Sequence, residues 1–439
     1  MKSQNWSFEK AEAFYHEMKN TLNKDPFTRL SEQTALLVNN KKCVFDVHCH
    51  IFDRKTLKIA YILLRMTIGK IFENENQDFR YWNKDIVNIY NSLNQIDDEV
   101  NWDELEKELE KLETKLSKSE TKESLRGKGL KDAIRVLKKD SMEEIFDFYH
   151  DNFSLKQIDQ YYDSPFVTSI LMMDLETGWK YKAKKTYPEQ VDELNSLARK
   201  KPILPFLAID PRRAEITGEQ NLYTIFKRAF TEKNAAFFGI KCYPSLGYFP
   251  SDKRLEPIFA LCEEFNIPVT THCGGESVST FEKTIDFFGE NGYETINLEG
   301  DRRKRARYLN DPTHWIPVLE KFPNLKLNLA HFGTDTFWEN HINTNADERI
   351  LKLIELLNDE SKKVFTDFSY NLIETDTHSK LKEVLNNNPK ITDKIMYGTD
   401  FWVVLPHGDL LNDIKLYLSV FQKYSEKMVS KNTWAFLFG

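Results

Sequence analysis

Short apolar runs, each as long as one buried strand, recur along the chain and alternate with helical patterns. Eight runs occur, rich in β-branched and aromatic residues and ended by polar ones. They cover residues 43–52, 166–176, 203–210, 237–244, 268–275, 325–333, 364–370 and 394–402. Eight strands alternating with helices predict an α/β fold of the (β/α)8 TIM-barrel type.

The competing arrangement is an open, doubly wound sheet, which normally carries a glycine-rich phosphate loop after an early strand. Neither GxGxxG nor GxxxxGK[ST] occurs in this sequence. Seven of the 16 glycines instead lie in or just after the fourth, fifth, sixth and eighth predicted strands. The loops on the active face of a barrel need such tight backbone, so glycine placement favours the barrel.

Two segments fall outside the strand–helix rhythm. Residues 1–42 predict a helical N-terminal extension, and the barrel, residues 43–439, is interrupted by a helical insertion over residues 54–163. Within the insertion, residues 102–116 show helical spacing, and Gly127 and Gly129 predict a break before a further helix. Because loops after strands overhang the active face, the insertion either covers a site or forms a peripheral subdomain or oligomer contact.

Charge and cysteine content exclude several classes of protein. Lysine plus arginine number 61 against 68 aspartate plus glutamate, a net charge of -7, which argues against nucleic-acid and membrane partners. The only dense basic run, residues 301–308, is interpreted as a solvated loop. Five cysteines without a CxxC pair, and no export signal or membrane-length apolar stretch, indicate a cytoplasmic protein. We expect a small-molecule substrate, and a homo-oligomer remains open.

Histidines gather at the ends of predicted strands. His48 and His50 are two residues apart on one strand, so both rings project from the same face and can hold one cation. His272 ends the fifth strand, His331 the sixth, and Asp400 the eighth. The carboxyl ends of barrel strands converge on one mouth, so these side chains predict a divalent-metal site.

Lys241 lies inside the fourth predicted strand, where a buried ammonium is costly without a partner. Three explanations stay open: it meets a substrate carboxylate or Asp210, it is carbamylated and bridges two metals, or it faces solvent. Arg212, Tyr243 and Trp402 are further candidates for substrate binding at the mouth. An arginine beside a metal pocket suits an anionic carboxylate.

The motifs DVHCHIF, IKCYPSLGY, TTHCGG, LAHFG and YGTDFW, in this order, resemble the amidohydrolase superfamily, specifically the branch similar to aminocarboxymuconate semialdehyde decarboxylase. The resemblance implies a metal held by His48, His50, His272 and Asp400, with His331 as a proton-transfer group or second-metal ligand. One zinc is favoured, while manganese or a second metal stays open. Lys241 also resembles the carbamylated strand-four lysine of dihydroorotase-like members.

These ligand types predict metal-assisted chemistry. A zinc site of nitrogens and one carboxylate keeps a position for water and polarises a carbonyl. Asp400 would take the proton of the water, and His331 would orient the water or stabilise negative charge. We therefore expect a metal-dependent hydrolase of C–N or C–O bonds acting on a carboxylate-bearing substrate. The alternatives are a non-oxidative decarboxylase of a small unsaturated or aromatic acid, and a metal-stabilised scaffold that acts through the insertion.

Overall fold

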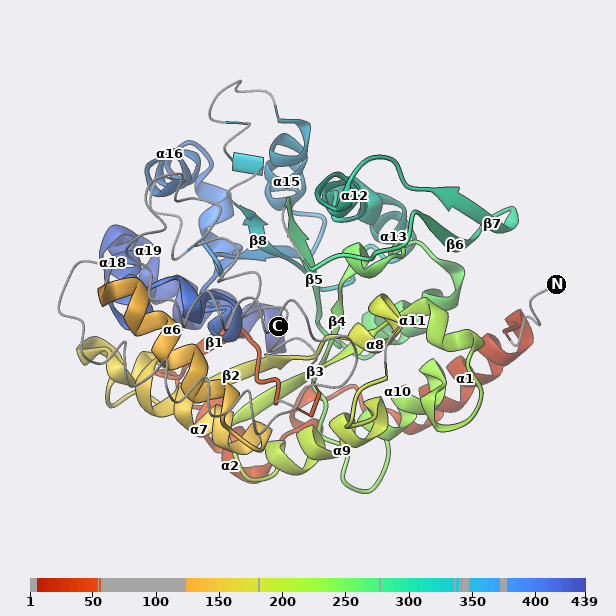
Figure 1. The fold of residues 1–439 in the computed structure, drawn as a ribbon, viewed down its shortest axis with the longest axis horizontal. Coiled ribbons are helices and arrows are strands. Elements are labelled where there is room, and N and C mark those ends of the chain that lie inside the picture. The colour runs from red at the N-terminus through yellow and green to blue at the C-terminus, as the bar shows by residue number, and fades with distance from the viewer. Residues whose placement is uncertain are drawn as a thin grey trace, which may run out of the picture.

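The computed structural model describes residues 6–53, 55–56, 124–180, 182–275, 278–334, 337–338, 341, 347–371 and 377–439. Figure 1 shows its helices arranged around a central set of strands. No helix in these ranges is long and apolar enough to cross a membrane. The predicted helices at residues 102–116 lie outside the described residues.

A parallel sheet of eight strands forms the centre of the fold, in the order β1-β2-β3-β4-β5-β8-β9-β10. The strands are β1 (Val44–Cys49), β2 (Phe166–Leu171), β3 (Ile203–Ile209), β4 (Gly239–Cys242), β5 (Val269–Gly274), β8 (Leu327–Gly333), β9 (Val364–Asp367) and β10 (Ile395–Met396). The Val47 N–H donates to the Tyr397 carbonyl across 3.0 Å, which connects the first strand to the last. The predicted TIM barrel and all eight of its strands are confirmed.

Helices lie between successive strands and after the last one, and bury an apolar stripe against the sheet, as amphipathic spacing requires. They are α6 (Ser124–Leu137), α7 (Met142–Asn152), α8 (Leu175–Trp179), α9 (Tyr187–Ala198), α10 (Leu222–Phe230), α11 (Glu256–Glu264), α12 (Arg302–Leu309), α13 (Ile316–Lys321), α15 (Glu348–Asn358), α16 (His378–Asn387), α17 (Phe401–Val404), α18 (Leu410–Val420), α19 (Gln422–Glu426) and α20 (Asn432–Phe438). Side-chain caps fix several starts; Thr186 and Glu189, for example, form a capping box at α9.

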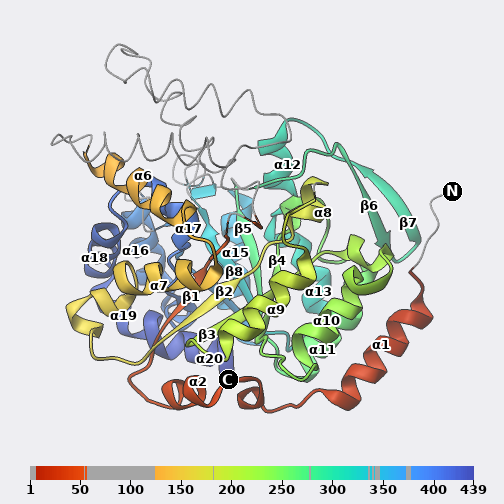
Figure 2. The ribbon, with the colours of Figure 1, turned by 60° about the horizontal axis from the view of Figure 1, so that its bottom comes forward.

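The N-terminal residues are helical, with α1 (Phe8–Thr21) and α2 (Glu32–Val38). Helix α1 runs along the outside of α10 and α11 (Figure 2). Phe14 stacks on Tyr223 with ring centroids 4.5 Å apart, and the Tyr15 hydroxyl donates to Glu264 across 2.8 Å. These contacts attach the extension to the side of the barrel.

Helices α6 and α7 belong to the predicted insertion and pack on the barrel. The predicted break at Gly127 and Gly129 is wrong, because α6 runs through both glycines without interruption. A Cβ on Gly129 would lie 2.4 Å from the Gly408 carbonyl oxygen and 2.6 Å from that of Leu405. This glycine therefore serves close helix–backbone packing and not a turn.

Two further segments differ from expectation. A two-stranded antiparallel hairpin, β6 (Thr284–Gly289) and β7 (Gly292–Asn297), was not predicted, although the Asn-Gly sequence at residues 291–292, where its turn ends, is a strong hairpin signal. The basic run was predicted to be a solvated loop and instead forms helix α12, because Asp301 caps its first turn. Arg305 of this helix is buried.

Candidate active site

The carboxyl ends of six barrel strands bring seven ionisable side chains together. They are His48 and His50 from β1, Lys241 from β4, His272 from β5, His331 from β8, Asp367 from β9 and Asp400 just after β10. All seven are buried. The predicted convergence of these strand ends places His48, His50, Lys241, His272, His331 and Asp400 in one cluster, and the structure adds Asp367.

His48, His50 and Asp400 form one side of the cluster. The Nε2 atoms of His48 and His50 lie 3.8 and 3.3 Å from Asp400 Oδ1. His50 Nδ1 lies 2.7 Å from the Leu171 carbonyl oxygen, which can only accept, so the hydrogen of this ring is on Nδ1. In the neutral ring, Nε2 is therefore a bare electron pair that faces a carboxylate oxygen. Two lone pairs that face each other in this way repel unless a proton or a cation lies between them.

His272 and His331 form the opposite side. His331 Nε2 lies 2.9 Å from His272 Nδ1, so one ring donates to the other or the two nitrogens share a cation. Tyr243 stacks on His272 with centroids 4.5 Å apart and an interplanar angle of 21°. This contact holds the imidazole of His272 in the plane that directs it towards His331.

Lys241 reaches the centre of the cluster. Its Nζ lies 3.4 Å from His48 Nε2, and its side chain is fully buried, so the alternative of a solvent-facing lysine is wrong. Among the described residues no hydrogen bond or ion pair joins Lys241 to Asp210, whose two oxygens bind Arg212. Burial lowers the pKa of Lys241 to about 8. The explanations that remain are a substrate carboxylate and a carbamate.

Burial also shapes the ionisation of the histidines and of Asp400. Burial first, and then the charge of Lys241, lowers the pKa of His48 to about 3, and burial lowers the pKa of His272 and His331 as well. Burial would raise the pKa of Asp400, but the imidazoles of His50 and His48 hold it well below its usual range. At neutral pH His48, His272 and His331 are thus neutral imidazoles and Asp400 is an ionised carboxylate, the forms that bind metals.

The donor set fits a divalent cation. His48, His50 and Asp400 each offer a ligand atom within 4.8 Å of the others, and so do His48, His331 and Asp367. Among the described residues, His272 Nε2 and Asp400 Oδ1 are buried polar atoms without a hydrogen-bond partner. Imidazole and carboxylate are ligands of zinc and of other divalent transition metals. The identity of the metal stays a prediction.

The remaining predicted substrate-binding residues lie around this cluster with internal contacts of their own. Arg212 forms a bidentate ion pair with Asp210 and donates to the Leu246 carbonyl oxygen across 2.9 Å. Trp402 donates its Nε1–H to the Phe52 carbonyl oxygen across 3.1 Å. The one donor of Trp402 is thus used, so its contact with a substrate would involve the ring face, whereas Arg212 Nη1 donates to none of the described residues and keeps its two N–H groups for a substrate. Their role in binding remains a prediction.

Sequence reasoning missed the residues behind the histidines. Asp367 ends β9, Ser369 follows it, and Asn328 lies in β8. All three are buried; Asp367 and Ser369 contact His48 or His331, and Asn328 contacts Asp367. The available signal was positional, because an Asp-x-Ser sequence ends the seventh predicted strand at the same edge as the histidines.

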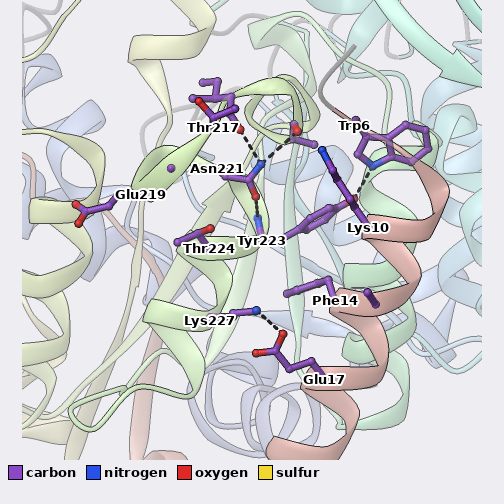
Figure 3. A pocket seen from close by; sticks show the side chains of 14 residues that line it. Trp6, Lys10, Phe14, Glu17, Thr217, Glu219, Asn221, Tyr223, Thr224 and Lys227 are labelled. Carbon is purple, nitrogen blue, oxygen red and sulfur yellow. Dashed lines mark hydrogen bonds and ion pairs between the residues drawn. The ribbon is translucent and has the colours of Figure 1, made fainter. Parts of the chain in front are cut away.

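A separate hollow of about 620 Å³ lies between α1 and α10, on the outside of the barrel. Figure 3 shows its labelled residues, which include Trp6, Lys10, Asn221 and Lys227. Lys227 pairs with Glu17. None of the predicted site residues lines this hollow, so it is not the candidate active site.

Comparison with solved structures gives several distant likenesses. An uncharacterised TIM-barrel protein of Bordetella bronchiseptica is 13% identical, with a TM-score of 0.44 and coverage of 90% of this chain and 98% of the other. A putative metal-dependent hydrolase of Lactobacillus casei is 11% identical, with a TM-score of 0.42 and coverage of 93% and 98%. A 4-oxalomesaconate hydratase of Rhodopseudomonas palustris is 13% identical, with a TM-score of 0.41 and coverage of 90% of this chain and 95% of the other.

No curated protein matches the sequence of the chain. The family model described as amidohydrolase matches residues 197–431, which carry Lys241, His272, His331, Asp367 and Asp400. The predicted resemblance to the superfamily is confirmed, and the decarboxylase-like branch stays a prediction. Because the match covers more than half of the 439 residues, the protein belongs to the amidohydrolase family.

Proposed function

We propose that the protein is a metal-dependent hydrolase that cleaves a C–N or C–O bond in a small, carboxylate-bearing substrate. Family membership supports a metal-dependent, hydrolase-like enzyme. The observation that carries the proposal is the buried cluster in which His48 Nε2 and His50 Nε2 face Asp400 Oδ1.

His48, His50, His272 and Asp400 would hold the metal. Zinc at such a site polarises a bound carbonyl and brings the pKa of a water towards neutrality. Asp400 is the candidate proton acceptor, because its carboxylate is ionised and Oδ1 has no hydrogen-bond donor among the described residues. The Asp400 N–H donates to the His48 carbonyl across 2.7 Å, so the backbone fixes this carboxylate beside the histidines.

His331 and Lys241 supply the other roles. His331 Nε2 lies 2.9 Å from His272 Nδ1 inside the cluster, where it can accept a proton and then donate it to negative charge that develops on the substrate oxygen. Lys241 provides a buried positive charge with Asp367 and Asp400 nearby but no carboxylate in direct contact among the described residues. A substrate carboxylate would complete its neutralisation, which supports an anionic substrate.

The first test is elemental analysis of protein purified without chelator or added metal. We expect about one zinc or manganese per chain, lost in His48→Ala and retained in Lys241→Met. His16→Ala, which removes an imidazole with 63% of its side chain exposed, is the matched control and should keep the metal. Two metals per chain that fall in Lys241→Met would indicate a carbamate-bridged pair, and absence of metal would overturn the proposal in favour of a scaffold.

The second test is a substrate screen with metal-loaded protein. The screen contains lactones, amides and cyclic imides, each with and without a carboxylate, so that the contribution of the substrate carboxylate to turnover can be measured. His331→Asn should lose turnover while keeping the metal. Release of CO₂ from unsaturated or aromatic acids, without lactone or amide cleavage, would replace hydrolysis with decarboxylation.

A further inference from the structure

Asp367 is fully buried and accepts hydrogen bonds on both of its carboxylate oxygens. Oδ1 accepts the backbone N–H groups of His331 and Ser369, each across 3.1 Å, and the hydroxyl of Ser369. Oδ2 accepts from Asn328 Nδ2 across 2.7 Å and lies 3.2 Å from His48 Nδ1. Five donors leave this carboxylate little capacity to bind a cation, although it lies within reach of one.

The charge of Asp367 decides where the hydrogen of His48 resides. Four donors besides His48 point at its two oxygens: the backbone N–H groups of His331 and Ser369, the Ser369 hydroxyl and the Asn328 amide. Hydrogen bonds of this kind favour the charged form, so Asp367 is an ionised carboxylate. An ionised carboxylate only accepts, so His48 Nδ1 carries the hydrogen that faces it. His48 Nε2 then presents a bare electron pair towards Asp400 Oδ1 and Lys241 Nζ.

Ser369 determines in the same way which nitrogen of His331 carries the hydrogen. Its single hydroxyl hydrogen points to Asp367 Oδ1, so the oxygen Oγ can only accept from its other neighbours. Oγ lies 2.8 Å from His331 Nδ1 and 3.1 Å from His48 Nδ1. His331 Nδ1 therefore carries a hydrogen, and its Nε2 is left bare towards His272.

Two asparagine side chains complete the hydrogen-bond network around Asp367 and His331. Asn328 reaches Asp367 from β8, and Asn371 donates to the His331 carbonyl. We propose that Asp367 and Ser369 are positioning residues that hold His48 and His331 as Nδ1–H tautomers, with both Nε2 atoms turned to the metal position. This inference rests on the proposed metal site, while the tautomers themselves are a property of the metal-free protein.

The direct test is ¹⁵N NMR of metal-free protein labelled selectively at histidine. His48→Asn and His331→Asn assign the two rings by the signals that disappear. We expect protonated Nδ1 and unprotonated Nε2 for both rings in the wild type. In Ser369→Ala the preference of His331 should weaken, because only the residue 369 carbonyl oxygen, 3.3 Å from Nδ1, is left to accept from this ring. A wild-type His48 or His331 ring protonated at Nε2 would overturn the inference, whatever the activity screen finds.

Metal affinity gives an independent readout. Asp367→Asn places an amide N–H₂ against existing donors, so the Kd for zinc, measured by chelator competition, should rise about 10- to 100-fold while stoichiometry at saturation is kept. Asp252→Asn removes another buried carboxylate, one that pairs with Arg254, and should leave the Kd unchanged. Unchanged affinity in Asp367→Asn would refute the positioning role, and loss of a metal at saturation would make Asp367 a ligand instead.

Discussion

Gly398 offers a way to disturb the site without altering any proposed ligand. A Cβ at this position would lie 2.7 Å from His48 Cβ, 3.1 Å from Ser369 Cβ and 3.3 Å from His48 N. Carbon atoms in good contact are about 3.5–4.0 Å apart, so Gly398→Ala requires a displacement of roughly 1 Å. Gly398 does not have a positive φ, so the cost of the substitution is steric and not conformational.

His48 cannot move away freely. Its N–H donates to Asp46 Oδ1 across 2.9 Å, and its carbonyl accepts from the Asp400 N–H across 2.7 Å. Overpacking of this kind costs about 1–3 kcal/mol. Catalytic groups tolerate misplacements of only about 0.5 Å, and a shift near 1 Å costs roughly 100-fold in rate. We expect Gly398→Ala to bind zinc at least tenfold more weakly, and to lose about 100-fold in kcat/KM on any substrate that the screen identifies.

The assay is chelator competition for zinc, together with urea unfolding of the metal-free protein. Gly408→Ala is the matched control, because among the described residues its Cβ would meet only Asp413 Oδ2, at 3.6 Å. It should match the wild type in affinity. Wild-type zinc affinity in Gly398→Ala would refute the reasoning, since it would show that His48 can shift without cost to the metal site.

Three further outcomes are expected. Asp400→Asn should abolish turnover and remain folded, because asparagine tolerates the positive φ of 55° at this position; near-normal kcat would disprove the role of the carboxylate. Gly129→Ala should loosen α6 by collision with the Leu405 and Gly408 backbone, seen as faster proteolysis between α6 and α7, and unchanged cleavage would contradict this packing. Burial, and then Arg29, lowers the pKa of Lys326 to about 7, so the folded state binds fewer protons than the unfolded state between pH 7 and about 10. Stability from this residue therefore rises with pH. Lys326→Met should gain about 2–3 kcal/mol less than the wild type between pH 7.5 and 9.5 in urea melts, and equal gains would rule out the lowered pKa.

The barrel could be predicted because its strands are buried on both faces and so appear as continuous apolar runs. The hairpin β6–β7 could not be found in the same way, since neither strand is buried throughout and its apolar residues are interrupted by polar ones instead of forming a continuous run. Gly129 shows a different limit. The sequence does not distinguish a glycine that breaks a helix from one that lets a helix pack closely against another backbone. The second role of Gly129 becomes visible only from its closeness to the carbonyls of Leu405 and Gly408.

The site was predictable to the extent that residue type reveals chemistry. Histidines at strand ends indicate a metal because few other environments favour several of them together. Asp367 and Ser369 carry no such signal, because Asp-x-Ser after a strand also suits an ordinary turn. Their importance depends on five donors that come from β1, β8 and β9, which no local pattern contains.

Backbone conformation adds a property that residue type does not reveal. His331, Phe332, Thr334, Tyr370 and Asp400 all have positive φ, and they follow or end β8, β9 and β10. Non-glycine residues in this region cost of order 1–3 kcal/mol each where the conformation is unfavourable, and they persist only when surrounding contacts hold them. At His331 those contacts are Asp367, which accepts its N–H, and Asn371, which donates to its carbonyl. The network that sets the tautomers of the histidines therefore also holds the strained backbone that aims them, so weakening Asp367 should affect ring position and protonation together.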